Sequence, residues 1–215
     1  DASIIKSNGE QSVEIIDNIY VKYNTNLKKK LKKIVDSCTS KVALKKLLKS
    51  IKKVEKEMTI RHADVCKIII KRNKKIKVNL IGFHGQTIIH KPQKGYSIQI
   101  GDSKLLSKLT KTSVISNFRD NDIKNGGQGA PLASLYHQAI LTKIKKIPIT
   151  IINIGGISNI TYIDRKKIIS FDIGPGNCLI DEWVRLNSKK QFDNDGKIAK
   201  LGSCNNKILN HLIKN

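Results

Sequence analysis

Residues 149–177 read ITIINIGGISNITYIDRKKIISFDIGPGN and carry the clearest signal for the fold. The runs 149–154 and 160–163 are rich in isoleucine and other β-branched residues, which is typical of strands. Gly155-Gly156 lies between them and has the backbone freedom that a tight turn needs. The stretch therefore begins with a predicted β-hairpin.

A strand-to-helix connection follows the predicted hairpin. We expect a further strand over 168–173 and a helix over 178–186, joined by a Gly-Pro-Gly-Asn loop. Strands that lead directly into helices are typical of α/β proteins. The fold class predicted from this stretch is therefore α/β.

Pro148 precedes the stretch and marks a predicted domain boundary. The residues before it repeat the same plan of hairpins and strand–helix connections, so we predict two α/β domains, over 1–147 and 148–215, around a cleft. In the first domain we expect strands over 2–5, 12–21, 77–83, 88–89, 96–100 and 114–117, helices over 24–53, 58–72, 102–109 and 131–141, and a long glycine-rich loop over 118–129.

The chain has 215 residues and a formal net charge of +24 at pH 7. Such a charge suggests nucleic acid or an acidic membrane surface as a partner. Nearly all of the basic residues are lysine, however, whereas proteins that read base edges lean on arginine. We interpret the lysines as a bias of the whole chain and as solvated helix faces, and we expect no specific nucleic-acid partner. A basic nucleic-acid-binding module is the alternative.

Targeting and metal signals are absent from the sequence. No apolar run approaches the about 20 residues that a membrane helix needs, and no signal-peptide pattern is present. The cysteines, Cys38, Cys66, Cys178 and Cys204, are widely spaced, which favours reduced thiols over a disulfide framework or a zinc site. We expect a cytoplasmic protein with no membrane partner and no cluster of metal ligands.

Two polar loops of the first domain are candidate sites. His84, Gln86 and Thr87 follow a predicted strand and offer several hydrogen-bonding groups, although a histidine at a strand end is also a common structural residue. Residues 118–132 combine Arg119 with carboxylates and a glycine-dense turn. A carboxylate there suits a general base, and a turn or cap residue is the alternative.

Two glycine loops of the second domain are candidate anion sites. The Gly-Gly turn exposes backbone N–H groups that suit a phosphate, although an ordinary hairpin turn explains it equally well. Residues 174–177 join a strand to a helix, and helix N-termini attract anions. Neither loop matches the P-loop or the dinucleotide fingerprint, so each one alone is weak evidence.

Taken in order, these loops resemble one family. The stretches are GFHGQTIIHKP (82–92), SIQIGD (97–102), FRDNDIKNGGQGAPL (118–132), NIGGISNIT (153–161) and FDIGPGNCLIDEW (171–183). Together they resemble the anhydro-N-acetylmuramic acid kinases of bacterial cell-wall recycling. The resemblance implies an actin-like, hexokinase-type ATPase fold with two RNase H-like domains around a cleft, both incomplete here. It also implies ATP and Mg²⁺ as cofactors, and hydrolysis of the 1,6-anhydro bond of the amino sugar with phosphorylation of its O6.

The resemblance also assigns roles to individual residues. Asp122 matches the catalytic base. His84, Gln86, Thr87 and Arg119 match the sugar side of the cleft. The residues that match the nucleotide side are Asp1, Asn153, Gly155, Gly156, Asn159, Thr161, Gly174, Gly176 and Asn177. No dense set of metal ligands is expected, because magnesium in such sites is held largely by waters and phosphates.

The sequence departs from the family at both ends. The phosphate loop that precedes Asp1 in the family, and the C-terminal part, have no counterpart here, so we expect a piece of a longer product. Because phosphoryl transfer depends on positioning, this chain alone is expected to be inactive or nearly so. A decayed remnant and a non-catalytic partner subunit are the alternatives, and a homodimer is left open for the full-length protein.

Overall fold

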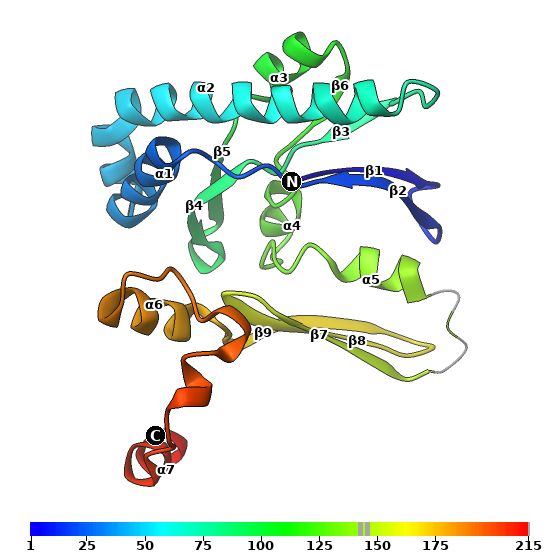
Figure 1. Cartoon of the computed structure of the whole chain (residues 1–215). Helices are drawn as coiled ribbons and strands as arrows, with labels where there is room; N and C mark the ends of the chain where they lie inside the picture. Colours follow the sequence, from blue (N-terminus) through cyan, green and yellow to red (C-terminus); the bar gives the residue numbers. More distant parts are fainter. Residues whose placement is uncertain (142–143, 145–146, 215) are drawn as a thin grey trace. The chain divides into compact units, whose positions relative to one another are not determined.

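The structure is a computed structural model that describes residues 1–141, 144 and 147–214. It is a mixed α/β protein, as predicted, and its internal contacts divide it into two compact units, Asp1–Lys145 and Lys146–Asn215 (Figure 1). The first unit contains β1 (Ala2–Ser7), β2 (Val13–Ile19), α1 (Thr25–Ser37), α2 (Lys41–Arg72), β3 (Leu80–Gly82), β4 (Gln86–Lys91), η1 (Pro92–Lys94), β5 (Tyr96–Ile100), α3 (Ser103–Thr110), β6 (Ser113–Ile115), α4 (Asp120–Lys124) and α5 (Ser134–Leu141).

The helices α1 and α2 begin at polar caps. The Leu27 N–H donates to Asn24 Oδ1 at 2.8 Å, and the Ala43 N–H donates to Ser40 Oγ at 3.1 Å. The predicted break between residues 53 and 58 is wrong, because α2 runs unbroken from Lys41 to Arg72. The four residues between them, Val-Glu-Lys-Glu, include neither glycine nor proline, so nothing there interrupts the backbone hydrogen bonds.

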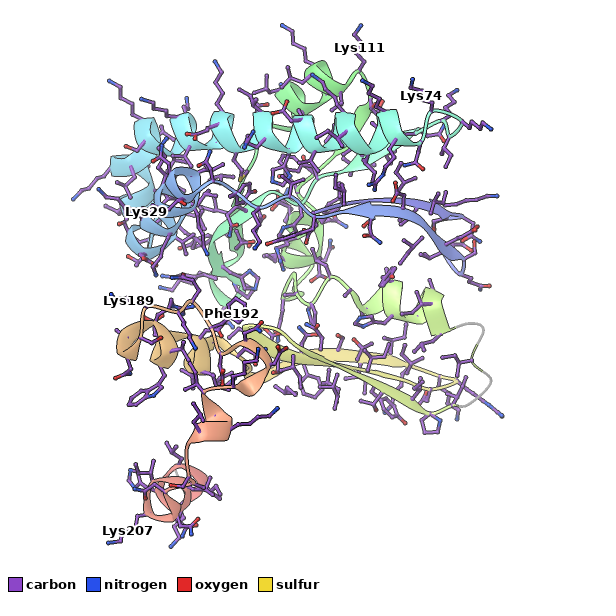
Figure 2. The ribbon with its side chains drawn as sticks, in the orientation of Figure 1. Lys29, Lys74, Lys111, Lys189, Phe192 and Lys207 are labelled. Carbon is purple, nitrogen blue, oxygen red and sulfur yellow. The ribbon has the colours of Figure 1, made fainter. Side chains whose placement is uncertain are left out.

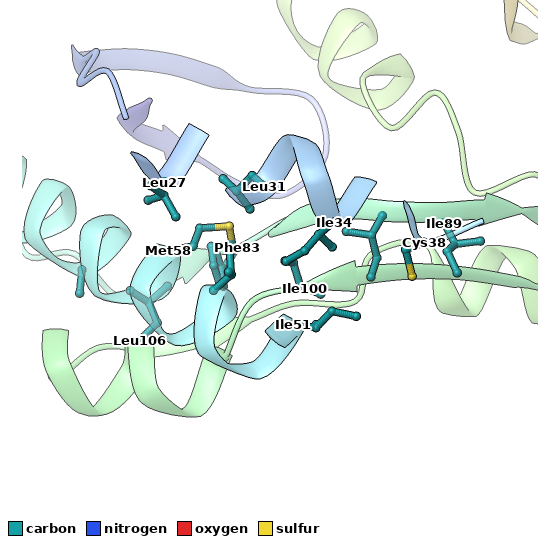
Figure 3. Close-up of a cluster of buried hydrophobic side chains, with 13 residues drawn as sticks. Leu27, Leu31, Ile34, Cys38, Ile51, Met58, Phe83, Ile89, Ile100 and Leu106 are labelled. Carbon is teal, nitrogen blue, oxygen red and sulfur yellow. The ribbon is translucent and has the colours of Figure 1, made fainter. Parts of the chain in front are cut away.

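The core of the first unit lies between these helices and the strands. Leu27 and Met58 are fully buried, and they are joined by Phe83, which follows β3, and by Leu106 of α3 (Figure 3). The lysines of α1 and α2 lie on the opposite, solvated faces, and Figure 2 shows Lys29 extending away from the core. The amphipathic pattern thus fixes which side of each helix is buried.

The strands of the first unit form three small ladders. β1 pairs with β2 and β4 pairs with β5, both antiparallel, as the predicted hairpins require, whereas β3 pairs in parallel with β6. The strand predicted over 77–83 extends only over Leu80–Gly82, because those residues alone have partners in β6. Strand length is set here by the partner, which lies more than thirty residues away along the chain.

Two further predictions for the first unit need correction. The loop over 118–129 contains the short helix α4, whose Ile123 is buried and anchors it. The helix expected from Pro131 begins at Ser134, and Pro131 lies in the irregular segment before it.

The second unit is built around a three-stranded antiparallel sheet. Its elements are β7 (Ile149–Ile154), β8 (Ile157–Ile163), β9 (Ile168–Pro175), α6 (Cys178–Asn187), η2 (Asn194–Gly196), η3 (Ala199–Leu201) and α7 (Asn206–Lys214). The order β7-β8-β9 confirms the predicted hairpin, its third strand and the helix that follows. Within the described ranges, no helix combines the length and apolar character needed to cross a bilayer.

Candidate functional site

His84 and Arg119 lie in contact, as the candidate site of the first unit requires. Arg119 Nη2 lies 2.9 Å from His84 Nε2, and His84 Nδ1 lies 3.0 Å from the Gly85 carbonyl oxygen. A carbonyl only accepts and a guanidinium only donates, so Nδ1 carries the proton and Nε2 supplies the lone pair. The geometry therefore selects one tautomer of the imidazole.

Asp122 lies one helical turn beyond Arg119, in the first turn of α4. Its side chain is exposed, and its Oδ2 accepts from the Gly129 N–H at 2.6 Å. Arg119 Nη1 donates to the carbonyl oxygen of the same Gly129 at 2.5 Å. The peptide groups of one glycine thus hold both charged side chains, while Asp122 remains exposed.

Gly127 shapes the surroundings of this carboxylate. Its N–H donates to the Asp122 carbonyl oxygen at 2.8 Å. A Cβ at Gly127 would lie 2.2 Å from Asp122 Oδ2, so a side chain there would force the carboxylate to move. A carboxylate held in this way can accept a proton from a ligand or a water in front of it. Sequence reasoning did not single out Gly127 or Gly129, although both belong to the glycine-dense turn.

Gln86 and Thr87 lie at the start of β4 and are half-buried. Gln86 Nε2 donates to the Thr87 carbonyl oxygen at 3.0 Å, and Thr87 Oγ1 accepts from Gln99 Nε2 at 3.3 Å. These bonds fix the strand beside the His84 loop. Gln86 and Thr87 follow His84 closely along the chain, and the His84 side chain makes the contact with Arg119.

Asp1 borders a separate cavity of about 350 Å³. Tyr23, His62 and Cys66 also line it, whereas His84, Arg119 and Asp122 do not. The Tyr23 hydroxyl lies 2.6 Å from His62 Nε2. Burial lowers the pKa of His62 and raises the pKa of Tyr23 and Cys66, so these groups stay uncharged near neutral pH. The lining is therefore largely uncharged apart from its rim.

In the Gly155-Gly156 turn of the second unit, the carbonyl oxygens accept hydrogen bonds from residues 176 and 177, whereas the N–H groups remain available to a ligand. The Asn177 N–H donates to the Gly155 carbonyl at 2.7 Å, and the Gly176 N–H donates to the Gly156 carbonyl at 2.8 Å. Within the described part of the chain, the N–H groups of Gly155 and Gly156 have no hydrogen-bond partner. Donors left open in this way suit the oxygens of a phosphate.

Three polar residues form a row across the sheet beside this turn. Asn153 pairs with Asn159 in the β7–β8 ladder, and Asn159 pairs with Asp172 in the β8–β9 ladder. Directly paired residues share a face of the sheet. Sequence reasoning missed Asp172, although its alternation with the flanking apolar residues could have placed it on this face. It is the one carboxylate of the row.

The remaining predicted residues of the second unit have structural partners. Thr161 is 1% exposed, and its Oγ1 lies 3.1 Å from Ser170 Oγ. It lies two residues beyond Asn159 in β8, so it is on the same face of the sheet as the polar row but is buried. Gly176 has no room for a side chain, because a Cβ would lie 2.3 Å from the Gly155 carbonyl oxygen. Gly174 and Asn177 flank this close approach, and Asn177 Nδ2 donates to the Ile154 carbonyl at 3.3 Å. The loop over 174–177 is thus fastened to the Gly-Gly turn.

Comparison with known proteins gives a consistent result. The family model described as anhydro-N-acetylmuramic acid kinase matches residues 1–215. Curated relatives of that name come from Pelagibacter ubique (46% identical over 220 residues, 100% of this chain and 58% of the relative), Gluconobacter oxydans (32% over 219 residues, 99% and 60%) and Rhizobium etli (35% over 207 residues, 94% and 56%). The chain therefore spans a little over half the length of the relatives it matches.

Proposed function

The chain belongs to the anhydro-N-acetylmuramic acid kinase family, and we propose that it provides the sugar site and part of the nucleotide site of such a kinase. The reaction would consume the anhydro amino sugar, ATP and water, and would yield the 6-phosphorylated sugar and ADP. The observation that carries the proposal is the exposed Asp122 carboxylate, held by Gly129 beside the Arg119–His84 pair.

Asp122 would act as the general base. It would take a proton from a water molecule while the water oxygen bonds to the anomeric carbon of the sugar. The bond between that carbon and O6 breaks in the same step, and the released O6 takes the γ-phosphoryl group of ATP as ADP leaves. Arg119 and His84 would orient the sugar, because their donors and acceptors are fixed by one another.

The β7–β8 turn would bind the phosphates of ATP. Two open N–H groups at Gly155 and Gly156 support this role, and the row of Asn153, Asn159 and Asp172 lies on one face beside them. Mg²⁺ would neutralise charge on the phosphates, and Asp172 is the residue of this row that would hold it. Thr161 lies on the same face, two residues beyond Asn159, and would support the row through its buried contact with Ser170.

The proposed fold is the actin-like, hexokinase-type arrangement of two RNase H-like domains. The mixed α/β composition of each unit and the division of the chain near residue 145 support it. ATP and the amino sugar are the proposed partners.

Nuclear magnetic resonance of the whole chain tests this function. Titration with anhydro-N-acetylmuramic acid should shift the amide signals of Arg119, Asp122 and Gly129, and titration with ATP and Mg²⁺ should shift those of Gly155 and Gly156. The Asp122→Asn variant keeps a similar shape but cannot take up the proton, so it should still bind the sugar. Sugar-induced shifts confined to other residues, or no binding by the wild-type chain, would refute the assignment.

A further inference from the structure

The long helix α2 contacts the turn after β5 through two polar side chains. Glu55 and Thr59 lie one turn apart on the face of α2 that meets the strands, and Thr59 is 0% exposed. Thr59 Oγ1 donates to the Glu55 carbonyl oxygen at 2.7 Å. Polar side chains that lose contact with water are costly unless they have specific partners, so the buried Thr59 and the half-buried Glu55 need an explanation.

Their partners are two consecutive amides of the turn after β5. The Gly101 N–H donates to Glu55 Oε1 at 2.8 Å, and the Asp102 N–H donates to Thr59 Oγ1 at 3.0 Å. The Asp102 side chain in turn accepts from the Leu105 N–H at 2.8 Å and caps α3. The turn is therefore fixed at successive peptide groups by one face of α2.

The same turn supports the loop that carries His84. Gly101 has φ +151°, and a Cβ there would lie 2.7 Å from the Phe83 ring and 3.3 Å from the Gly85 Cα. Gly85 approaches the Ile100 carbonyl so closely that its own Cβ would lie 2.4 Å from that oxygen. The residues on either side of His84 therefore rest directly on the turn that Glu55 holds.

We infer that Glu55 and Thr59 are positioning residues, which set the orientation of His84 toward Arg119 by fixing the Gly101–Asp102 turn. Close contacts connect each step, from α2 to the turn, from the turn to Phe83 and Gly85, and from His84 to Arg119. The inference deepens the proposed function, on which its relevance to sugar binding rests. The geometry at His84 can be tested without that function.

The test measures the imidazole ¹⁵N spectrum of His84 in the whole chain, together with amide exchange at Gly101. The wild-type protein should show one His84 species with the proton on Nδ1. In Glu55→Ala, exchange at Gly101 should accelerate by about 10-fold or more, because a buried donor loses its partner. His84 should then show mixed tautomers.

Matched variants separate positioning from general destabilisation. Glu55→Gln keeps an oxygen acceptor and should preserve the His84 spectrum. Glu57→Ala removes a part-buried glutamate of the same helix that pairs with Lys30 at 2.7 Å, and it should leave His84 unchanged. The inference is overturned if Glu55→Ala leaves the spectrum of His84 unaltered, if Glu57→Ala alters it equally, or if Glu55→Gln fails to preserve it.

A second pair of variants guards against unfolding. Thr59→Val removes the acceptor at nearly constant shape and should also mix the tautomers, whereas Thr59→Ser should preserve the single species. Failure of both Glu55→Ala and Thr59→Val to fold would mean a role in stability alone and would overturn the inference.

Sugar affinity should fall by about 10-fold in Glu55→Ala and stay unchanged in Glu57→Ala. A wild-type chain that binds no sugar would refute the proposed function only, and the His84 spectrum would still decide the positioning role.

Discussion

The substitution Gly127→Ala tests whether the Asp122 carboxylate is held where the proposed reaction needs it. The added Cβ would lie 2.2 Å from Asp122 Oδ2 and 2.4 Å from its Oδ1. Gly127 does not have a left-handed backbone conformation, so alanine strains no dihedral angle there. The substitution therefore acts on the carboxylate alone.

The size of the effect follows from these distances. To reach an ordinary van der Waals contact, the Asp122 oxygens must withdraw by about 1 Å. The 2.6 Å hydrogen bond from the Gly129 N–H to Oδ2 cannot survive that displacement. A hydrogen bond to a charged group contributes about 1.5–3 kcal/mol, so Gly127→Ala should lower the free energy of unfolding by about that amount.

The assay combines urea unfolding, amide exchange at Gly129 and sugar affinity. Exchange at Gly129 should accelerate by about 10- to 100-fold, and affinity for the anhydro sugar should fall by about 10-fold or more. Gly126→Ala is the matched control. It has φ +87° and open space around its Cβ, so it should cost about 1–2 kcal/mol of stability without disturbing the carboxylate.

The reasoning would be refuted by either of two results. Gly127→Ala could bind the sugar as tightly as wild type and retain a protected Gly129 amide, which would mean that Asp122 is not held by this bond. Alternatively, Gly126→Ala could weaken sugar binding as strongly as Gly127→Ala. The loss of sugar affinity would then result from a general change in the loop that contains both glycines, and not from displacement of the Asp122 carboxylate.

Three further substitutions test the packing and the ionisable groups. Met58→Ala should lower the free energy of unfolding in urea by about 2–5 kcal/mol, because Met58 is 0% exposed, whereas Leu201→Ala, at a position 90% exposed, should change it little. Burial lowers the pKa of His62 from 6.5, so its contribution to stability is present above pH 6.5 and is lost as pH falls through the lower folded pKa. His62→Gln should remove that pH dependence, and an unchanged slope below pH 6.5 would contradict the assignment. Hydrogen bonds from Asn73 and Arg72 hold the pKa of Asp17 below 3.8, so this stabilisation is present above pH 3.8 and is lost at lower pH. Asp17→Asn should flatten the acid limb of the urea stability profile and leave the slope near pH 6.5 intact; loss of both slopes would refute it.

The sequence determined the local elements of this protein. The isoleucine runs on either side of Gly155-Gly156 form the predicted hairpin. Asp102 caps α3, the predicted helix that begins at the next residue. These features depend on neighbouring residues, since caps, turns and β-branched runs act over a few positions. The order of the glycine-rich motifs likewise identified the family and the loop that contains Asp122.

Only the tertiary structure decided the exact lengths of these elements and the contacts between them. β3 is three residues long because only three of its residues pair with β6. The helix α4 forms inside a predicted loop because Ile123 is buried. Nothing in the sequence indicates that Thr161 is buried, or that Glu55 holds a turn 46 residues away. Each of these features rests on contacts between distant residues, whose formation depends on packing and loop closure, and no local pattern in the chain encodes them.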